Sequence, residues 1–301
     1  MRAGKPVYTE KPLSNSHEEM LQIHQAFRET KVPVCVGHNR RSSPAILELK
    51  RLLDRVRNER LEGLAPSVMR ASNRRRMPEE DALQILMRIN DDSRSWKPWI
   101  FHDQEGIIFA EMVHFVDLAI WLNHAPPVRV VTEGSPRGNF TIVLTFADGS
   151  MTTMQHSLVG HFDYPKELFE ISHRNVTLAL DQHFELRQTG MIDEPALTYF
   201  PFSPKATWAK KQGMAGYMEE VRQEQEAALR ENRPARILGA VKGHDAHMDR
   251  FLDHLEGRGE NPASIESAIH TSRVALKALH SAQTGLPVPI HPQDWSLPDL
   301  D

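Results

Sequence analysis

The chain has 301 residues, of which 40% are hydrophobic and 25% charged, and its formal net charge is −4 at pH 7. This composition is that of a globular protein with a sizeable core, and the slightly acidic balance disfavours nucleic acid or an anionic membrane as the main partner. No apolar stretch approaches the ~18 residues of a membrane span, the N-terminus has no signal pattern, and the single cysteine, Cys35, excludes an internal disulfide and fits a reducing cytoplasm.

The first forty residues predict one strand–helix–strand unit. Residues 5–10 (KPVYTE) are rich in β-formers, and residues 32–37 (VPVCVG) are apolar throughout, as in a sheet covered on both faces. Between them, residues 16–31 carry apolar side chains at helical spacing behind a capping box, in which Ser16 caps the first turn and Glu19 reaches back. The order strand, helix, strand indicates a βαβ unit with parallel strands.

The next segment predicts helices separated by a stretch that is hard to assign. Residues 44–58 form an amphipathic helix whose inner stripe is Ile46, Leu49, Leu52, Leu53 and Val56. Residues 65–72 favour a strand, residues 73–105 are polar and give no assignment, and residues 107–122 are apolar with a helical period.

The second half predicts an antiparallel sheet followed by helices. Two hairpins are expected, at 140–146 with 151–158 and at 166–172 with 176–181, and a further strand at 183–190. A loop is expected over 190–207, helices over 214–231, 236–256 and 263–283 with Gly285 as a C-cap, and then an extended proline-rich tail. The predicted fold class is therefore an α/β unit followed by an α+β domain with a mostly antiparallel open sheet and flanking helices.

Lys11 is the first residue with possible chemistry. It lies between Glu10 and Pro12, just past the carboxyl end of a predicted parallel strand, where open α/β sheets bind ligands. Because proline stiffens the backbone there, the ammonium group could donate a hydrogen bond to a substrate hydroxyl and favour loss of its proton. The alternative is an exposed surface lysine.

A polar stripe in the apolar 107–122 segment is the second candidate. Glu111, His114 and Asp117 are three residues apart, which places them on one side of a helix. A carboxylate beside an imidazole can fix its tautomer and raise its pKa, so His114 would be a general base for an alcohol. The alternative is a core histidine satisfied by its helical neighbours.

The third candidate follows the second strand. His38, Asn39, Arg40 and Arg41 lie at the same sheet edge as Lys11, and an arginine there could bind an anionic group of a cofactor or substrate. The alternative is a pair of arginines at a helix entrance. The histidine-containing tracts 161–167 and 244–247 offer no informative third ligand, so no metal site is expected.

Together these segments resemble the Gfo/Idh/MocA family of NAD(P)-dependent oxidoreductases. The resemblance rests on GKPVYTEKPLS (4–14), VGHNRRSSPA (36–45) and EGIIFAEMVHFVDLAIWL (105–122), and it continues through FTIVLTFADGSM (140–151) and the helices at 242–257 and 267–288. It implies a Rossmann domain followed by an α/β domain whose open sheet forms a homo-oligomer interface. It also implies a sugar, inositol or related polyol as the small-molecule substrate and NAD or NADP as the cofactor.

The resemblance assigns roles to single positions. The residues implied to be catalytic are Lys11, His114 and Glu111. Those implied near the cofactor are Glu10, Pro12, Asn39 and Arg40, and those implied near the substrate are Lys11, Arg41 and Asp117. Many family members have an aspartate four residues before the histidine, where this chain has Ala110, and Glu111 is the nearest carboxylate that could replace it.

The chain departs from the family at its start. No G-x-G-x-x-G turn occurs in the 301 residues, although that turn holds the cofactor pyrophosphate at a helix N-terminus. We therefore expect residues 1–40 to correspond to the end of a Rossmann domain that lacks on the order of 100 residues, and residues 41–301 to form the substrate and oligomerisation domain.

Three functions follow from this reading. The first is hydride transfer between NAD(P) and a polyol hydroxyl, with His114 as the base and Lys11 polarising the oxygen. The second is a non-catalytic truncated relative or partner subunit, which the missing phosphate-binding turn favours. The third is an NAD-dependent glycosidase, which would release sugar without net cofactor reduction.

Overall fold

A computed structural model describes residues 1–58, 81–101, 106–161, 163–203 and 205–297 of the chain. Its helices are α1 (His17–Thr30), α2 (Pro44–Asn58), α3 (Val113–Leu122), α4 (Gly213–Arg230), α5 (His244–Leu255), α6 (Ile265–Thr284) and α7 (Pro292–Trp295). Four shorter turns are η1 (Asn39–Ser42), η2 (Ser93–Ser95), η3 (Pro98–Phe101) and the π-helical turn η4 (Ile108–Met112). None of the helices described is both long and apolar enough to cross a membrane.

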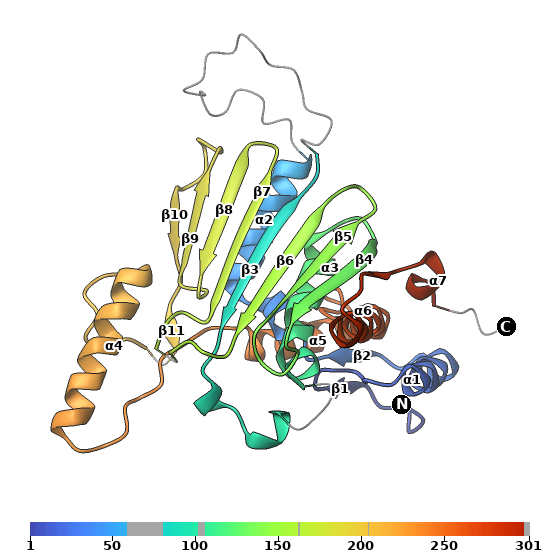
Figure 1. Cartoon of the computed structure of the whole chain (residues 1–301), viewed down its shortest axis with the longest axis horizontal. Coiled ribbons are helices and arrows are strands. Elements are labelled where there is room, and N and C mark those ends of the chain that lie inside the picture. Colours follow the sequence, from blue (N-terminus) through green and yellow to red (C-terminus); the bar gives the residue numbers. More distant parts are fainter. Residues whose placement is uncertain (59–80, 102–105, 162, 204, 298–301) are drawn as a thin grey trace, which may run out of the picture.

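A nine-stranded sheet dominates the molecule, and α2, α3 and α6 lie behind it in Figure 1. Its strands are β3 (Gln84–Asn90), β4 (Pro127–Gly134), β5 (Phe140–Phe146), β6 (Met151–Ser157), β7 (Glu167–His173), β8 (Val176–Asp181), β9 (Glu185–Thr189), β10 (Leu197–Tyr199) and β13 (Val288–Pro289). They lie in the order β10-β9-β8-β7-β3-β6-β5-β4-β13. Only the central pair, β3 with β6, is parallel, so the prediction of a mostly antiparallel sheet is confirmed.

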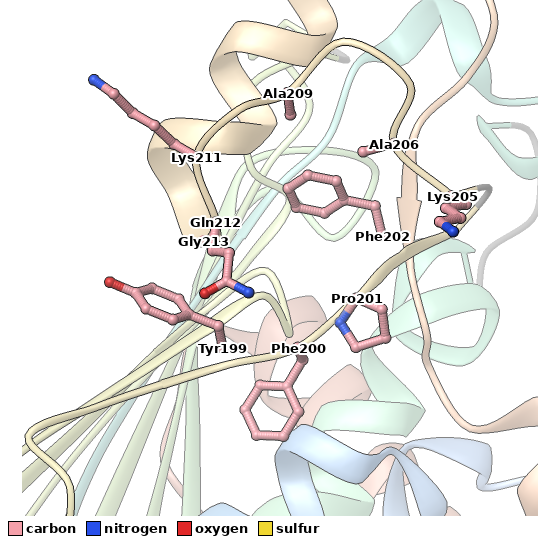
Figure 2. A pocket seen from close by; sticks show the side chains of 10 residues that line it. All are labelled: Tyr199, Phe200, Pro201, Phe202, Lys205, Ala206, Ala209, Lys211, Gln212 and Gly213. Atoms are coloured by element: carbon pink, nitrogen blue, oxygen red, sulfur yellow. The ribbon is translucent and has the colours of Figure 1, made fainter.

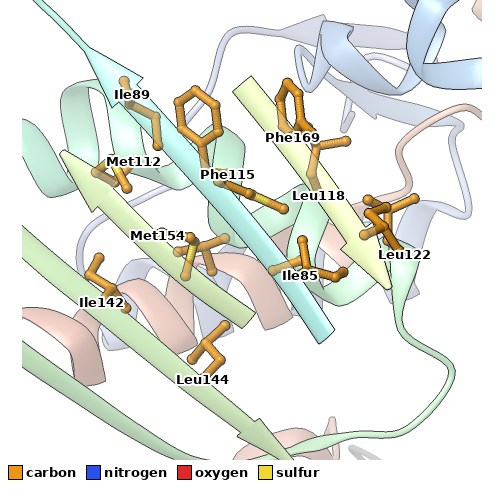
Figure 3. Packing of buried hydrophobic residues seen from close by; sticks show 14 of the residues in the cluster. Ile85, Ile89, Met112, Phe115, Leu118, Leu122, Ile142, Leu144, Met154 and Phe169 are labelled. Atoms are coloured by element: carbon orange, nitrogen blue, oxygen red, sulfur yellow. The ribbon is translucent and has the colours of Figure 1, made fainter. Parts of the chain in front are cut away.

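The predicted hairpins β5–β6 and β7–β8 are both present, and β3 lies between them. No element was expected at β3, nor at β4. Alternate residues of β3 point into the core, where they meet η4, α3 and the neighbouring strands (Figure 3). The residues labelled there are Ile85, Ile89, Met112, Phe115, Leu118, Leu122, Ile142, Leu144, Met154 and Phe169. This core holds η4 and α3 against the sheet and so fixes the position of His114.

The N-terminal unit is a two-stranded parallel sheet of β1 (Val7–Thr9) and β2 (Val34–Val36), joined by α1 as predicted. It packs on α6, because Met20 and Val34 share a hydrophobic cluster with Ile265 and Ile269. The carboxyl ends of β1 and β2 therefore lie side by side, with the Gly37 N–H donating to the Thr9 carbonyl at 2.8 Å.

The predicted capping box at α1 is half correct. The Ser16 hydroxyl accepts a hydrogen bond from the Glu19 N–H at 3.4 Å, as expected. The Glu19 carboxylate does not reach back to Ser16. It accepts instead from the Ser14 hydroxyl at 2.8 Å, and Ser14 Oγ accepts the Ser16 N–H at 2.9 Å. Ser14 thus takes the place that the capping box gives to the glutamate.

Replacing Ser16 with alanine is expected to lower the free energy of unfolding by about 1 kcal/mol, because the first turn of α1 loses its side-chain cap. Urea denaturation followed by circular dichroism measures the change. Ser135→Ala is the serine control, because Ser135 is exposed in the turn between β4 and β5. A loss below about 0.3 kcal/mol for Ser16→Ala would mean that the network around Ser14 suffices.

Four other expectations need correction or fall outside the described residues. The tail expected to be extended after Gly285 contains the short strand β13 and the short helix α7. Within 190–207, expected to be a loop, lie β10 and β11 (Phe202–Ser203), and β11 pairs with β12 (Gly239–Ala240). The helix expected over 236–256 begins only at His244, because Gly243 adopts φ 85° and breaks the helical path. The strand expected at 65–72 lies outside the described residues. The remaining helices, including the stripe of α2 and the Gly285 C-cap, are confirmed.

Candidate active site

Lys11 extends from the end of β1 to the π-helical turn η4. Its ammonium group donates a hydrogen bond to the Ala110 carbonyl, ninety-nine residues further along the chain. The side chain is half-buried, so it is not the exposed surface lysine of the alternative reading. Burial lowers the pKa of Lys11, and the nearby charges of Arg40 and Lys166 lower it further against the opposing charge of Glu111. Its neighbours Glu10 and Pro12 lie at the same strand end, Glu10 exposed and Pro12 half-buried.

Arg40 lies in η1 at the end of β2 and is buried among carboxylates. Its Nε and Nη2 donate to the two oxygens of Glu167 at 3.0 and 2.8 Å, and Nη2 also donates to Glu111 Oε1 at 3.0 Å. The guanidinium lies 4.9 Å from the centre of the Phe115 ring. Next to it, Asn39 Nδ2 donates to the Lys242 carbonyl at 2.8 Å. The arginine edge predicted to bind an anion is therefore engaged by carboxylates of the chain itself.

Arg41 makes a second bidentate pair. Its Nε and Nη2 donate to the two oxygens of Asp117 at 2.7 and 2.6 Å, and Thr271 Oγ1 donates to Asp117 Oδ1 at 3.1 Å. Both partners of the pair are buried. Burial would raise the pKa of Asp117, but the charge of Arg41 outweighs it and holds the pKa below its usual value.

Glu111 belongs to a set of charged side chains that we call the Arg40 cluster: the buried Arg40, Glu111 and Glu167 and the half-buried Lys166 and Lys242. Lys166 Nζ lies 2.9 Å from Glu111 Oε1 and 2.9 Å from Asp91 Oδ2, and Lys242 Nζ donates to Glu167 Oε1 at 2.5 Å. Burial would raise the pKa of Glu111, but Lys166 and Arg40 outweigh it and lower that pKa to about 2. Glu111 is therefore ionised at neutral pH.

His114 differs from the expectation. Its Nδ1 is buried with no hydrogen-bond partner among the described residues, so neither Glu111 nor Asp117 fixes its tautomer. The two carboxylates turn to Arg40 and Arg41 instead of to the imidazole. Burial, reinforced by the positive charges of Arg40 and Lys11, holds the pKa of His114 well below its usual 6.5, whereas the sequence reading expected it to be raised. The imidazole is therefore neutral at pH 7 and able to accept a proton.

The sequence did not reveal three of the five residues of the Arg40 cluster. Lys166 and Glu167 lie in the tract 161–167, which drew attention only for its histidine, and Lys242 precedes the tract 244–247. The sequence signal that could have revealed Lys166 and Glu167 is their position as adjacent charges at the start of a predicted strand. No group of three histidine, cysteine or acidic side chains among the described residues is placed to hold a metal ion.

Figure 2 shows a separate pocket of about 370 Å³. The rings of Tyr199, Phe200 and Phe202 form its walls, together with the segment that leads to Gly213 at the start of α4. None of the site residues predicted from the sequence lines it, so the convergence of Lys11 and His114 remains the better candidate for an active site.

Comparison with solved structures identifies the fold. The chain superimposes on myo-inositol dehydrogenase from Corynebacterium glutamicum with a TM-score of 0.61 and 18% identity, over 95% of this chain and 73% of that one. It matches scyllo-inositol dehydrogenase from Lactobacillus casei with a TM-score of 0.62 and 13% identity, over 96% and 73%. The chain has the fold of the Gfo/Idh/MocA oxidoreductases. At these identities the likeness shows the fold, and the chain spans about three quarters of the solved Gfo/Idh/MocA chains.

Other comparisons agree with this fold. UDP-N-acetylglucosamine 3-dehydrogenase from Acidithiobacillus ferrooxidans gives a TM-score of 0.59 at 16% identity, over 94% of this chain and 72% of that one. Among curated proteins, inositol 2-dehydrogenase 2 from Saccharopolyspora erythraea is 47% identical over 55 residues, which are 18% of this chain and 16% of that protein. No family model matches the sequence.

Proposed function

We propose that the chain is an oxidoreductase of the Gfo/Idh/MocA type, which transfers hydride between NAD(P) and a hydroxyl of a sugar, inositol or related polyol. One observation carries the proposal: the Lys11 ammonium donates to the carbonyl of Ala110, four residues before His114. A cation and a neutral imidazole from distant parts of the chain thus converge at the end of two parallel strands, where ligands bind in such sheets.

The proposed roles follow from charge. Neutral His114 accepts the proton of the substrate hydroxyl, and the Lys11 ammonium stabilises the negative charge that develops on the oxygen. Glu111 holds Lys166 and Arg40 in place through its ion pairs. It is also the nearest carboxylate to Ala110, the position at which many family members have an aspartate. Arg41 and Asp117 form a second ion pair, and we propose that this pair borders the substrate.

A bound nicotinamide would supply the hydride acceptor. Among the residues that the structure describes, none accepts from or donates to the buried His114 Nδ1, so a further polar group could still be bound here. Lys11, Glu10, Pro12, Asn39 and Arg40 are the residues proposed to lie near the nicotinamide end. The phosphate-binding glycine turn has no counterpart in the sequence. In Rossmann domains the choice between NAD and NADP is made by a residue after that turn, which contacts the 2′ position of the ribose.

The test is calorimetric titration of the folded chain with NADH and NADPH, followed by assays on a panel of polyols with wild type and Lys11→Ala. Micromolar binding, about 8 kcal/mol, and polyol oxidation that Lys11→Ala abolishes would support the proposal. Absence of binding by a folded sample would favour a non-catalytic relative or partner subunit. Release of sugar without net cofactor reduction would favour the glycosidase.

We further propose that the chain forms a homo-oligomer through the open face of its sheet. That face, opposite the helices, exposes Leu86 and Met151 on the adjacent strands β3 and β6. Apolar side chains exposed on a broad, flat sheet favour burial against a second copy.

Leu86→Glu is expected to convert the oligomer to a monomer in light scattering coupled to size-exclusion chromatography, because a carboxylate in an apolar interface is desolvated without a partner. Leu229→Glu is the matched control, since Leu229 lies on α4 and is 84% exposed. An oligomer that persists in Leu86→Glu, or a wild-type monomer, would contradict this interface.

A further inference from the structure

The pocket of Figure 2 has no role in the proposed reaction. Its volume of about 370 Å³ lies in the range of small-molecule sites, and its walls are the rings of Tyr199, Phe200 and Phe202. Tyr199 is 41% exposed, and the other two rings are half-buried. Aromatic rings gathered around an open cavity leave apolar surface in contact with water, and a bound ligand would remove that contact.

The rings are held in place by the chain itself. The Phe202 ring lies edge-on to Phe184, with ring centres 4.6 Å apart and planes at 81°, and its centre is 6.2 Å from that of Tyr217. The Tyr199 ring rests on Gly213, where a Cβ atom would come to 2.7 Å from Tyr199 Cε1. Because such walls need no ordering when a ligand binds, more of the contact energy remains as affinity.

The segment that closes the pocket is also fixed. Glu220 on α4 is 0% exposed, and its carboxylate accepts hydrogen bonds from the N–H groups of Thr207, Trp208 and Ala209 at 2.9, 2.7 and 2.8 Å. Ala209 lines the pocket, so this buried carboxylate ties one wall of the pocket to the helix. The cavity is therefore preformed.

Three polar side chains border the pocket. Gln212 precedes α4, and its side-chain amide makes no hydrogen bond to any residue that the structure describes. Lys205 and Lys211 are exposed on either side of the rings in Figure 2, and neither forms an ion pair within the described part of the chain. An amide that can both donate and accept, together with two such cations, favours a ligand with a polar edge and a negative charge.

The balance of rings and polar groups distinguishes between two kinds of ring compound. A sugar presents several hydroxyls, and each of them costs free energy when it is buried without a hydrogen-bond partner. The pocket offers mainly aromatic and aliphatic side chains and a single amide. A nucleobase has two flat faces that stack on tyrosine or phenylalanine, and its polar atoms lie only at its edge. The walls therefore favour a base, and the lysines favour a phosphate attached to it.

We propose that this pocket binds a mononucleotide. The base stacks on Tyr199 and Phe202. The Gln212 amide bonds to the edge of the base, and Lys205 and Lys211 pair with the phosphate. The pocket is separate from the proposed catalytic position, because none of the residues proposed to be catalytic lines it. The inference therefore does not depend on hydride transfer, and no bond of the nucleotide forms or breaks.

The first experiment is calorimetric titration of the folded chain with AMP and UMP, and with adenosine, inorganic phosphate and glucose 6-phosphate as separate arms. We expect AMP or UMP to bind with a dissociation constant below about 1 mM, and adenosine and phosphate to bind at least about tenfold more weakly. Absence of binding by both nucleotides would overturn the proposal. Phosphate bound as tightly as the nucleotides would indicate a simple anion site, and tighter binding of glucose 6-phosphate would indicate a sugar phosphate site, and either result would overturn it too.

The second experiment locates the bound nucleotide. Tyr199→Ala is expected to weaken nucleotide binding at least about tenfold, because the base loses a stacking partner. The double variant Lys205→Gln with Lys211→Gln changes only exposed side chains, and it is expected to weaken binding of the nucleotide but not of adenosine. Tyr164→Ala is the matched control, since Tyr164 is 55% exposed and does not line the pocket. Binding that either pocket variant leaves unchanged, or that Lys11→Ala abolishes, would place the nucleotide elsewhere and overturn the proposal.

Discussion

Replacing Glu167 with alanine is expected to lower the free energy of unfolding by about 3–5 kcal/mol. The carboxylate is fully buried and accepts hydrogen bonds from Arg40, from Lys242 and from His183 Nε2 at 3.0 Å. Without it, the buried Arg40 and the half-buried Lys242 lose the carboxylate that they share, and an uncompensated charge in such a place is costly. Urea denaturation of wild type and variant measures the loss.

Glu170 provides the matched control, because it lies three residues further along β7 with its side chain exposed. Glu170→Ala is expected to change stability by no more than about 0.5 kcal/mol. Glu167→Gln keeps the size of the side chain and removes its charge, so it separates electrostatics from packing. If Glu167→Gln were as stable as wild type, the Arg40 cluster would not be held together by charge.

The stability that the Glu167 carboxylate provides should decrease as the pH falls. Burial alone would raise its pKa, but Arg40 and Lys242 outweigh burial and hold the pKa well below the usual 4.5. A carboxyl group with a depressed pKa in the folded state stabilises the protein at pH values above its unfolded pKa, and that stabilisation is lost as pH falls through the folded value. The difference between wild type and Glu167→Gln should therefore be full at pH 7 and shrink below pH 4.5.

The sequence predicted the helices better than the centre of the sheet, for a physical reason. The stripe of α2 repeats with a clear helical period, and its buried residues match the prediction. Strand β3 has the alternating Ile85, Met87 and Ile89, but Leu86 on the open face breaks the alternation between apolar and polar residues. The sequence around β3 is polar, so only pairing with distant strands identifies it.

The candidate site shows the same limit. The family resemblance alone implied that Lys11 lies near the turn that contains Glu111, and its hydrogen bond to Ala110 fits this. Local spacing predicted that Glu111, His114 and Asp117 lie on one side of a helix. It did not predict the partners, because Arg40 with Glu167 and Lys242 with Glu167 are 127 and 75 residues apart. A buried carboxylate pairs with the strongest cation within reach, so Glu111 and Asp117 bind arginines and leave His114 neutral.

Replacing His114 with glutamine is expected to lower the rate of polyol oxidation by about 10²–10⁴-fold, the usual contribution of a general base. Because its pKa lies well below 6.5, the neutral base form persists at pH 7. The wild-type rate should therefore stay level from pH 7 down past 6.5 and fall only in more acid solution. Initial rates across pH 5–9 measure both effects, with thermal melting to verify that the variant folds.

His280→Gln serves as the control, since His280 is exposed on α6 and lies more than two turns beyond Thr271, the residue of that helix that contacts the site. It should keep the wild-type rate and pH profile. A wild-type acid limb centred near pH 6.5 would indicate an imidazole in water and contradict the buried, neutral base. A His114→Gln variant that keeps the wild-type rate would move the proton acceptor elsewhere, and the convergence of Lys11 with η4 would then serve to hold the fold rather than to perform chemistry.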